Sequence, residues 1–251
     1  MLELQGIRKT FYPGTPNEKK ALNGVDLHLN AGDFVTIVGS NGAGKSTLFN
    51  AISGVFSVDE GTIRLDSKNI TNMKEYKRAY DIGRLFQDTM KGTAPNMTIE
   101  ENLALAYSRK AGKSFFAVNK QDREYFTELL KQLDLGLESR MKAKVGQLSG
   151  GQRQAVSLLM STISQPKLLL LDEHTAALDP ATARKVLDIT TRIVSEGRIT
   201  TMMITHDMQA ALTLGNRTIM MDDGKIIFDI SGEERAKMTV EDLLECYHEN
   251  S

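Results

Sequence analysis

Hydrophobic and polar residues alternate along several short stretches of the chain, and this period of two predicts strands with one buried face. Leu2 to Leu4, Val25 to Leu29 and Gly61 to Asp66 show the alternation. Asp33 to Val38 and Lys167 to Leu171 are instead largely apolar, as strands buried on both faces of a parallel sheet are. The two patterns together predict an α/β fold.

The middle of the chain changes to helical spacing. Thr98 to Glu101 form a capping-box sequence at the start of an apolar helix. Asn119 is the predicted cap of a second helix, beyond a polar linker from Lys110 to Phe116. Ser149 to Gln152 form another capping box that opens a third helix. A helical insert is therefore predicted between two parts of a sheet-containing core.

The last third of the chain returns to alternating helices and strands. Asp179 is the predicted cap of a helix that Gly197 ends. Thr200 to Ile204 is a further buried strand, and Asp223-Gly224 between two apolar runs predicts a hairpin. The tail is predicted to hold one short helix, Val240 to Tyr247.

Composition narrows the class of protein. The 251 residues are 41% hydrophobic and 25% charged, with a net charge of −1, so the chain lacks the basic signature of a dedicated nucleic-acid binder. The single Cys246 has no internal disulfide partner, which suits a reducing compartment. The first residues do not resemble a signal peptide, and no stretch approaches the ~20 apolar residues of a membrane span. A membrane role would therefore require a partner.

One stretch fits the phosphate-loop pattern G-x-x-x-x-G-K-[ST] and lies between a predicted strand and a predicted helix. Glycines let successive N–H groups point at an anion, and the helix N-terminus adds partial positive charge. The lysine can reach the β- and γ-phosphates of a nucleotide, and the following hydroxyl can ligate Mg²⁺. The residues of this loop are Gly39, Ser40, Asn41, Gly42, Ala43, Gly44, Lys45, Ser46 and Thr47.

Acidic and basic residues follow the predicted parallel strands, where ligands of such sheets bind. Asp172 comes at the end of a strand and can hold Mg²⁺, and Glu173 can polarise an attacking water. His206 follows the next strand and can contact a γ-phosphate, although a lone histidine is more often structural. Phe11 precedes the loop and either stacks on a purine or only anchors its own turn.

These motifs, in this order, resemble the ATP-binding cassette (ABC) ATPases from Leu2 to about Asp229. The resemblance implies a P-loop NTPase (RecA-like) core with an antiparallel β subdomain and an inserted α-helical subdomain. It implies one domain over residues 1–251, in which 1–87 and 166–230 form the nucleotide-binding core. Residues 88–165 would form the helical subdomain with the signature motif, and 231–251 a short tail.

The resemblance also implies a role for each matching position. Gln87 would be the glutamine that contacts Mg²⁺ with Ser46 and Asp172, and Phe11 the aromatic residue that stacks on adenine, with Tyr12 as the alternative. Lys45, Gln87, Glu173 and His206 would be catalytic. The family's signature motif, here Leu148 to Gln152, would bind nucleotide through Ser149, Gly150, Gly151 and Gln152. Asp179, in the family's D-loop, would bind nucleotide as well.

The implied function is that of an ATPase subunit of a transporter. Two copies would bind two Mg-ATP head to tail and drive integral-membrane permease subunits at the cytoplasmic face of the cell membrane, without direct contact with nucleic acid. His174, where the family has proline, and the run from Asn96 to Leu103 resemble a subgroup of bacterial uptake ATPases. Some of these work beside solute-binding lipoproteins for aromatic amino acids, so import with an extracytoplasmic solute-binding protein is expected.

Three alternatives remain open at this point. An exporter ATPase would carry the same motifs. A soluble ABC ATPase acting on nucleic acid or ribosomes typically has two cassettes or long coiled coils, whereas this chain has one phosphate loop and no long heptad run. A non-catalytic binding module would not need Asp172, Glu173 and His206. The transported solute, and whether the ATPase pair is homodimeric or heterodimeric, do not follow from the sequence.

Overall fold

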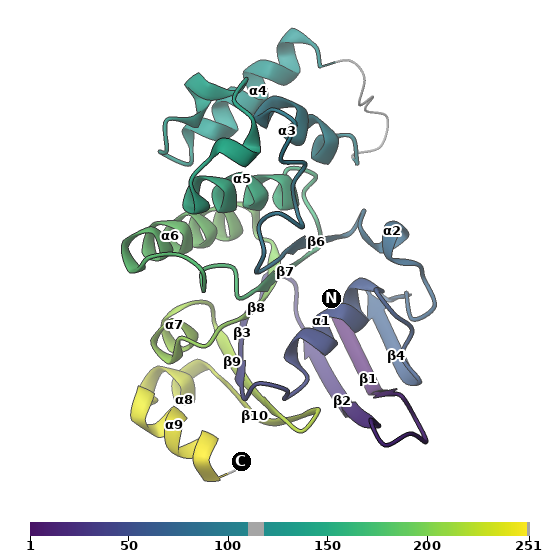
Figure 1. The fold of residues 1–251 in the computed structure, drawn as a ribbon. Coiled ribbons are helices and arrows are strands. Elements are labelled where there is room, and N and C mark those ends of the chain that lie inside the picture. Colours follow the sequence, from purple (N-terminus) through teal and green to yellow (C-terminus); the bar gives the residue numbers. More distant parts are fainter. Residues whose placement is uncertain (110–117, 250–251) are drawn as a thin grey trace.

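Two sheets form the framework of the protein (Figure 1). The computed structural model describes residues 1–109 and 118–249. The smaller sheet is antiparallel, with the strand order β2-β1-β4-β5. Its strands are β1 (Leu2–Phe11), β2 (Lys19–Leu29), β4 (Glu60–Leu65) and β5 (Lys68–Asn69).

The larger sheet has six strands in the order β10-β9-β3-β8-β7-β6. All of its neighbouring pairs are parallel except the β9–β10 hairpin. The carboxyl ends of its parallel strands therefore meet at one edge, where such sheets bind ligands. Its strands are β3 (Phe34–Gly39), β6 (Ile82–Leu85), β7 (Leu168–Asp172), β8 (Thr200–Ile204), β9 (Arg217–Asp222) and β10 (Lys225–Ser231).

Helices lie in separate groups around the sheets, and those between β6 and β7 gather at one end of the molecule (Figure 1). That group comprises α3 (Ile99–Tyr107), α4 (Lys120–Lys131), η1 (Leu137–Arg140), η2 (Val145–Gln147) and α5 (Gly150–Thr162). The others are α1 (Lys45–Ser53), α2 (Glu75–Arg78), α6 (Pro180–Gly197), α7 (Met208–Thr213), α8 (Gly232–Lys237) and α9 (Val240–Glu249). None of the helices in the described part of the chain has the length and hydropathy of a membrane span.

The helix starts predicted from the sequence are confirmed. Thr98 and Ser149 each complete a capping box, and Asn119 and Asp179 cap α4 and α6 through their side chains. The hairpin at Asp223-Gly224 is confirmed as well. The linker predicted from Lys110 to Phe116 lies outside the described residues.

Two predictions about helices were wrong. Gly197 remains inside α6, and Arg198 takes the left-handed conformation (φ 48°) that ends it. The tail holds two helices, because α8 precedes α9. The short α8 buries no side chain and shows no apolar period. Arg235 instead holds α8 in place by donating hydrogen bonds to the carbonyls of Ala211 and Gly215.

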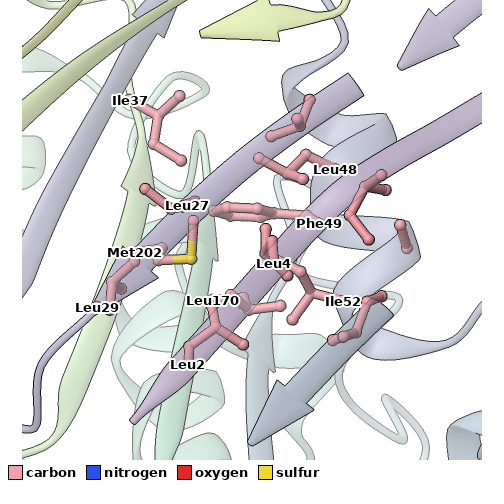
Figure 2. Close-up of a cluster of buried hydrophobic side chains, with 14 of the residues drawn as sticks. Leu2, Leu4, Leu27, Leu29, Ile37, Leu48, Phe49, Ile52, Leu170 and Met202 are labelled. Carbon is pink, nitrogen blue, oxygen red and sulfur yellow. The ribbon is translucent and has the colours of Figure 1, made fainter. Parts of the chain in front are cut away.

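The two faces of β7 belong to two hydrophobic clusters. Leu168 and Leu170 pack in a cluster that joins both sheets to α1, whereas Leu169 and Leu171 pack among α3, α4, α5 and α6. In the first cluster Phe49 of α1 points between the sheets and is fully buried (Figure 2). The continuous apolar run thus reflects burial on both faces.

The N-terminus of α5 packs closely on the start of α6. A Cβ atom on Gly151 would lie 2.2 Å from Cγ2 of Thr182, and one on Gly150 would lie 3.2 Å from Cδ2 of Leu178. The cap of α6 is part of the same contact, since Thr182 donates its backbone N–H to Asp179 (3.1 Å). The two helix starts therefore form one packed unit.

Gly151→Ala should lower the free energy of unfolding by about 1–3 kcal/mol, because the added methyl group overlaps the Thr182 side chain. Thr182→Ser removes Cγ2 and keeps the hydroxyl group. The double variant Gly151→Ala/Thr182→Ser should therefore be more stable than the sum of the two single changes predicts. Urea unfolding of the four proteins measures this coupling, and strictly additive changes would contradict the packing.

Candidate active site

The phosphate loop connects β3 to α1 and has no room for side chains at two of its glycines. Gly39 has φ 143°, and a Cβ atom there would lie 2.1 Å from the carbonyl oxygen of Met221. Gly44 has φ 100°, and a Cβ atom there would lie 2.5 Å from the carbonyl oxygen of Ala21. Gly44 precedes the first turn of α1, and no side chain of the described residues caps that turn. The backbone N–H groups of the turn are thus free to bind an anion.

Lys45 is folded back onto the loop. Its ammonium group donates hydrogen bonds to the carbonyls of Gly39 (2.6 Å) and Ser40 (2.9 Å). Burial lowers the pKa of Lys45, and the carboxylates of Glu173 and Asp172 oppose this shift. The end of the Lys45 side chain therefore lies inside the loop, beside two acidic residues.

A cleft of about 200 Å³ opens over this loop. It brings together three groups predicted from separate parts of the sequence: Phe11, the phosphate loop and Glu173. Ala43 points away from it and is buried, while its carbonyl accepts the N–H of Gly224 (3.0 Å). The residues of the loop that line the cleft are Ser40, Asn41, Gly42, Gly44, Lys45, Ser46 and Thr47.

Glu173 and His206 form a pair at the carboxyl ends of β7 and β8. Nε2 of His206 lies 2.7 Å from Oε1 of Glu173. An ionised carboxylate only accepts hydrogen bonds, so the imidazole donates this one. Glu173 has a left-handed backbone (φ 46°), and its N–H donates to the carbonyl of Ile204 (3.2 Å). This turn directs the carboxylate into the cleft.

The oxygen atoms at the end of β7 suit Mg²⁺, which prefers hard oxygen ligands and nucleotide phosphates. Oδ1 of Asp172 lies 3.3 Å from the Ser46 hydroxyl group. Oδ2 of Asp172 lies 3.4 Å from Arg84, and both side chains of this ion pair are largely buried. Burial raises the pKa of Asp172, and Arg84 opposes that shift. The chemistry of the donors thus fits the metal expected from the sequence.

Other predicted site residues lie elsewhere in the fold. Ser149, Gly150, Gly151 and Gln152 form the start of α5, and none of them lines the cleft. Asp179 caps α6 beside them, and among the described residues no hydrogen bond joins its side chain to the phosphate loop. Gln87 is exposed beyond the end of β6. A single copy of the chain therefore holds the phosphate loop and the signature residues at separate places.

Sequence reasoning missed Lys19 and Arg84. Lys19 lines the cleft beside Phe11, and Arg84 is the ion-pair partner of Asp172. The cross-strand pairing of β1 with β2 places Lys19 opposite Phe11, and that register cannot be read from the chain. Phe11 itself lines the cleft and packs edge to face on Phe56 (5.4 Å), so both of its alternative roles remain compatible with its position.

His174, the residue that replaces the usual proline, is buried and points toward α6. Its Nε2 lies 3.3 Å from the hydroxyl group of Thr190, which donates to the carbonyl of Val186 (2.8 Å). Because that hydroxyl hydrogen is already used, the imidazole donates to Thr190. Burial lowers the pKa of His174 to about 4. The side chain therefore ties the turn after Glu173 to α6 as a neutral histidine.

Comparison with known proteins matches the chain to a transporter family and to ATP-binding proteins of transporters. A family model described as ABC transporter matches residues 22–176. The tyrosine transport ATP-binding protein of Clostridioides difficile is 42% identical and covers 98% of both chains. The methionine import ATP-binding protein MetN of Clostridium tetani is 32% identical, over 90% of this chain and 68% of that protein.

Solved structures match the whole fold. The ATP-binding cassette MJ0796, in a dimeric post-hydrolysis state bound to ADP and Pi, has a TM-score of 0.79 and 30% identity. The match covers 92% of this chain and 98% of the MJ0796 chain. The ADP conformation of MJ1267, an ATP-binding cassette of an ABC transporter, has a TM-score of 0.79 and 30% identity. That match covers 99% of this chain and 98% of the MJ1267 chain. The P-loop NTPase fold predicted from the sequence is confirmed.

The stability of the protein should fall in acid partly because of His174. Its folded-state pKa of about 4 lies below the ordinary 6.5. The stability that neutral His174 contributes is therefore fully present above pH 6.5 and falls progressively as the pH drops from 6.5 to 4. The loss at pH 4 should be on the order of 3 kcal/mol. Urea unfolding at several pH values should show that His174→Gln removes this part of the pH dependence.

His28 provides the control, because it is an exposed histidine on β2. His28→Gln should leave the pH dependence of unfolding as it is in the wild type. If His174→Gln and His28→Gln gave the same pH dependence, the buried position of His174 would not be the cause.

Proposed function

The chain belongs to the ABC transporter family and is an ATP-hydrolysing, ATP-binding subunit of a transporter, and from this premise we propose that two copies bind two Mg-ATP head to tail and drive a separate membrane permease. The observation that carries the assignment of ATP hydrolysis is the 2.7 Å hydrogen bond between His206 and Glu173 at the edge of the phosphate-loop cleft. Hydrolysis of a γ-phosphate needs a phosphate cradle, a metal ion and a residue that positions the attacking water. Glu173 lines the cleft beside such a cradle, and His206 holds its carboxylate.

Binding of the nucleotide is assigned to the cleft. The N–H groups at the start of α1 and the Lys45 ammonium group would contact the β- and γ-phosphates, in place of the carbonyls that Lys45 contacts now. Phe11 would stack on the adenine. Ser46 and Asp172, with Gln87, would hold Mg²⁺, which neutralises charge on the β- and γ-phosphate oxygens.

Hydrolysis is assigned to Glu173 and His206. The Glu173 carboxylate takes a proton from the attacking water, whose oxygen bonds to the γ-phosphorus while the bond to the β–γ bridging oxygen breaks. The His206 imidazole donates a hydrogen bond that orients the carboxylate in this structure and would stabilise the charged γ-phosphate in the transition state. Positioning and electrostatics account for most of the rate in such reactions.

Dimerisation explains why the signature residues lie away from the cleft. Each phosphate loop would face Ser149 to Gln152 of the other copy, and the helix start there offers a second anion site. Asp179 lies next to that helix start and would meet the same interface. The similarity to a dimeric cassette bound to ADP and Pi supports this arrangement.

Amino-acid import is the proposed transport function. It is supported by the relatives named for tyrosine transport and methionine import. The permease would contact the segment from Gln87 to Met97, where Met90 exposes 42% of its surface. In this proposal the subunit works at the cytoplasmic face of the membrane, and an extracytoplasmic solute-binding protein delivers the solute. Residues 1–87 and 166–230 would form the nucleotide-binding core, with 88–165 as the helical subdomain.

Glu173→Gln should bind Mg-ATP but hydrolyse it about 10²–10⁴-fold more slowly, because the amide cannot accept the water's proton. Steady-state phosphate release and ATP binding on the purified protein measure the two effects. Glu196→Gln changes an exposed carboxylate at the end of α6 and should leave the rate unchanged. Near wild-type turnover by Glu173→Gln would exclude the assigned base.

Mixing two inactive variants tests the head-to-tail dimer. Lys45→Ala removes the phosphate contact, and Ser149→Arg blocks the signature, so each protein alone has two damaged sites. In a one-to-one heterodimer one site combines both changes and the other is intact. ATP hydrolysis should therefore reappear on mixing, below half of the wild-type rate if the two sites are cooperative.

The same mixture separates the two possible architectures. If each copy completed its own site, heterodimers would stay inactive. The milder pair Lys45→Arg and Ser149→Ala serves as a check that the variants still associate, and continued inactivity of verified heterodimers from both pairs would rule out the sandwich.

A further inference from the structure

Lys19 lines the cleft and belongs to the residue pair nearest the connection between β1 and β2. Its Cα atom pairs with that of Phe11, and the next pair joins Thr10 to Lys20. Directly opposed residues share a face of the sheet, and neighbours along a strand point to opposite faces. Lys19 therefore points to the same side as Phe11, toward the phosphate loop, and Lys20 points away from it.

The Lys19 ammonium group reaches the middle of the loop. A Cβ atom on Gly42 would lie 3.3 Å from Nζ of Lys19. Lys19 also lines the cleft, together with Lys45 and Glu173 as the other charged side chains. The two lysines give the cleft a net positive charge, and without Lys19 the charges of Lys45 and Glu173 would cancel.

The hydrogen bonds around the cleft leave Lys19 available for a ligand. Lys45 is bonded to the carbonyls of Gly39 and Ser40, and Lys9 on the neighbouring strand pairs with Asp59 (2.7 Å). Within the described residues, the Lys19 side chain takes part in no hydrogen bond or ion pair. Its charge is thus directed at the open cleft and is not neutralised by the protein.

The aromatic neighbour of Lys19 is held in a fixed orientation. Phe11 packs edge to face on Phe56, with ring centroids 5.4 Å apart and an interplanar angle of 85°. A purine on Phe11 would thus have its phosphate chain run past Lys19 toward Gly42. This order of contacts separates a base position at Phe11 from a phosphate position at Lys19.

We propose that Lys19 is a second phosphate-binding cation of the nucleotide site, which contacts the polyphosphate chain from the β2 side while Lys45 contacts it from inside the loop. The proposal rests on the proposed nucleotide site and adds a specific residue to it. A cation at the mouth of the cleft also draws a polyanion toward it, so the contact should depend strongly on salt.

Lys19→Ala tests the proposal, with Lys20→Ala as the matched control. Equilibrium binding of ATP is measured in EDTA, so that hydrolysis does not interfere. In about 50 mM salt, Lys19→Ala should weaken binding by about three- to tenfold, and the loss should shrink to less than about twofold near 0.5 M salt. Lys20→Ala and Lys19→Arg should stay within about twofold of the wild type.

Inorganic tripolyphosphate, which has no base, identifies the part of the nucleotide that Lys19 contacts. Lys19→Ala should weaken its competition against ATP by the same factor as it weakens ATP binding. Unchanged competition by tripolyphosphate, or equal losses in Lys19→Ala and Lys20→Ala, would overturn the proposal. A wild-type protein that bound neither ATP nor tripolyphosphate would instead contradict the proposed function, and that result precedes any variant.

Discussion

Close backbone contact around the phosphate loop is the constraint on which the rest of the structure depends. The β9–β10 turn, the start of β2 and the loop meet without side chains between them: Gly224 donates its N–H to the Ala43 carbonyl (3.0 Å), and its carbonyl accepts the N–H of Asn23 (2.8 Å). Gly44 fits against the Ala21 carbonyl only because it lacks a Cβ atom. The same contact therefore shapes the anion site, joins the two sheets and brings Phe11 and Lys19 over the loop.

Charge balance is the second constraint, because four ionisable side chains meet near the carboxyl ends of β3 and β7. Burial raises the pKa of Asp172, and the charge of the adjacent Glu173 carboxylate acts in the same direction. Lys45 and Arg84 compensate from opposite sides, Lys45 from the loop and Arg84 from β6. Arg84 also lies over the Phe86 ring (4.6 Å), which fixes the guanidinium plane beside the carboxylate.

Features set by neighbouring residues could be predicted from the sequence, and features set by packing could not. Capping boxes at Thr98 and Ser149 need only residues three positions apart, and the phosphate loop needs nine consecutive residues. Lys19 lies in the site because the register of β1 and β2 pairs it with Phe11. Arg84 lies there because it forms an ion pair with Asp172, which is 88 positions away in the sequence. The end of α6 at Arg198 was missed because a glycine one position earlier offered the more usual signal.

The turn after β7 links the two halves of the proposed composite site through α6. Glu173 adopts a left-handed backbone, which is costly for a residue with a side chain. The following His174 is buried against Thr190, and this contact fixes the turn to the middle of α6. The first turn of α6 in turn packs on the signature helix, where Thr182 leaves no room for a Cβ atom on Gly151. One helix thus contacts both the residue after the proposed base and the motif that the proposed dimer would present to the other copy, so a shift of α6 would move both together.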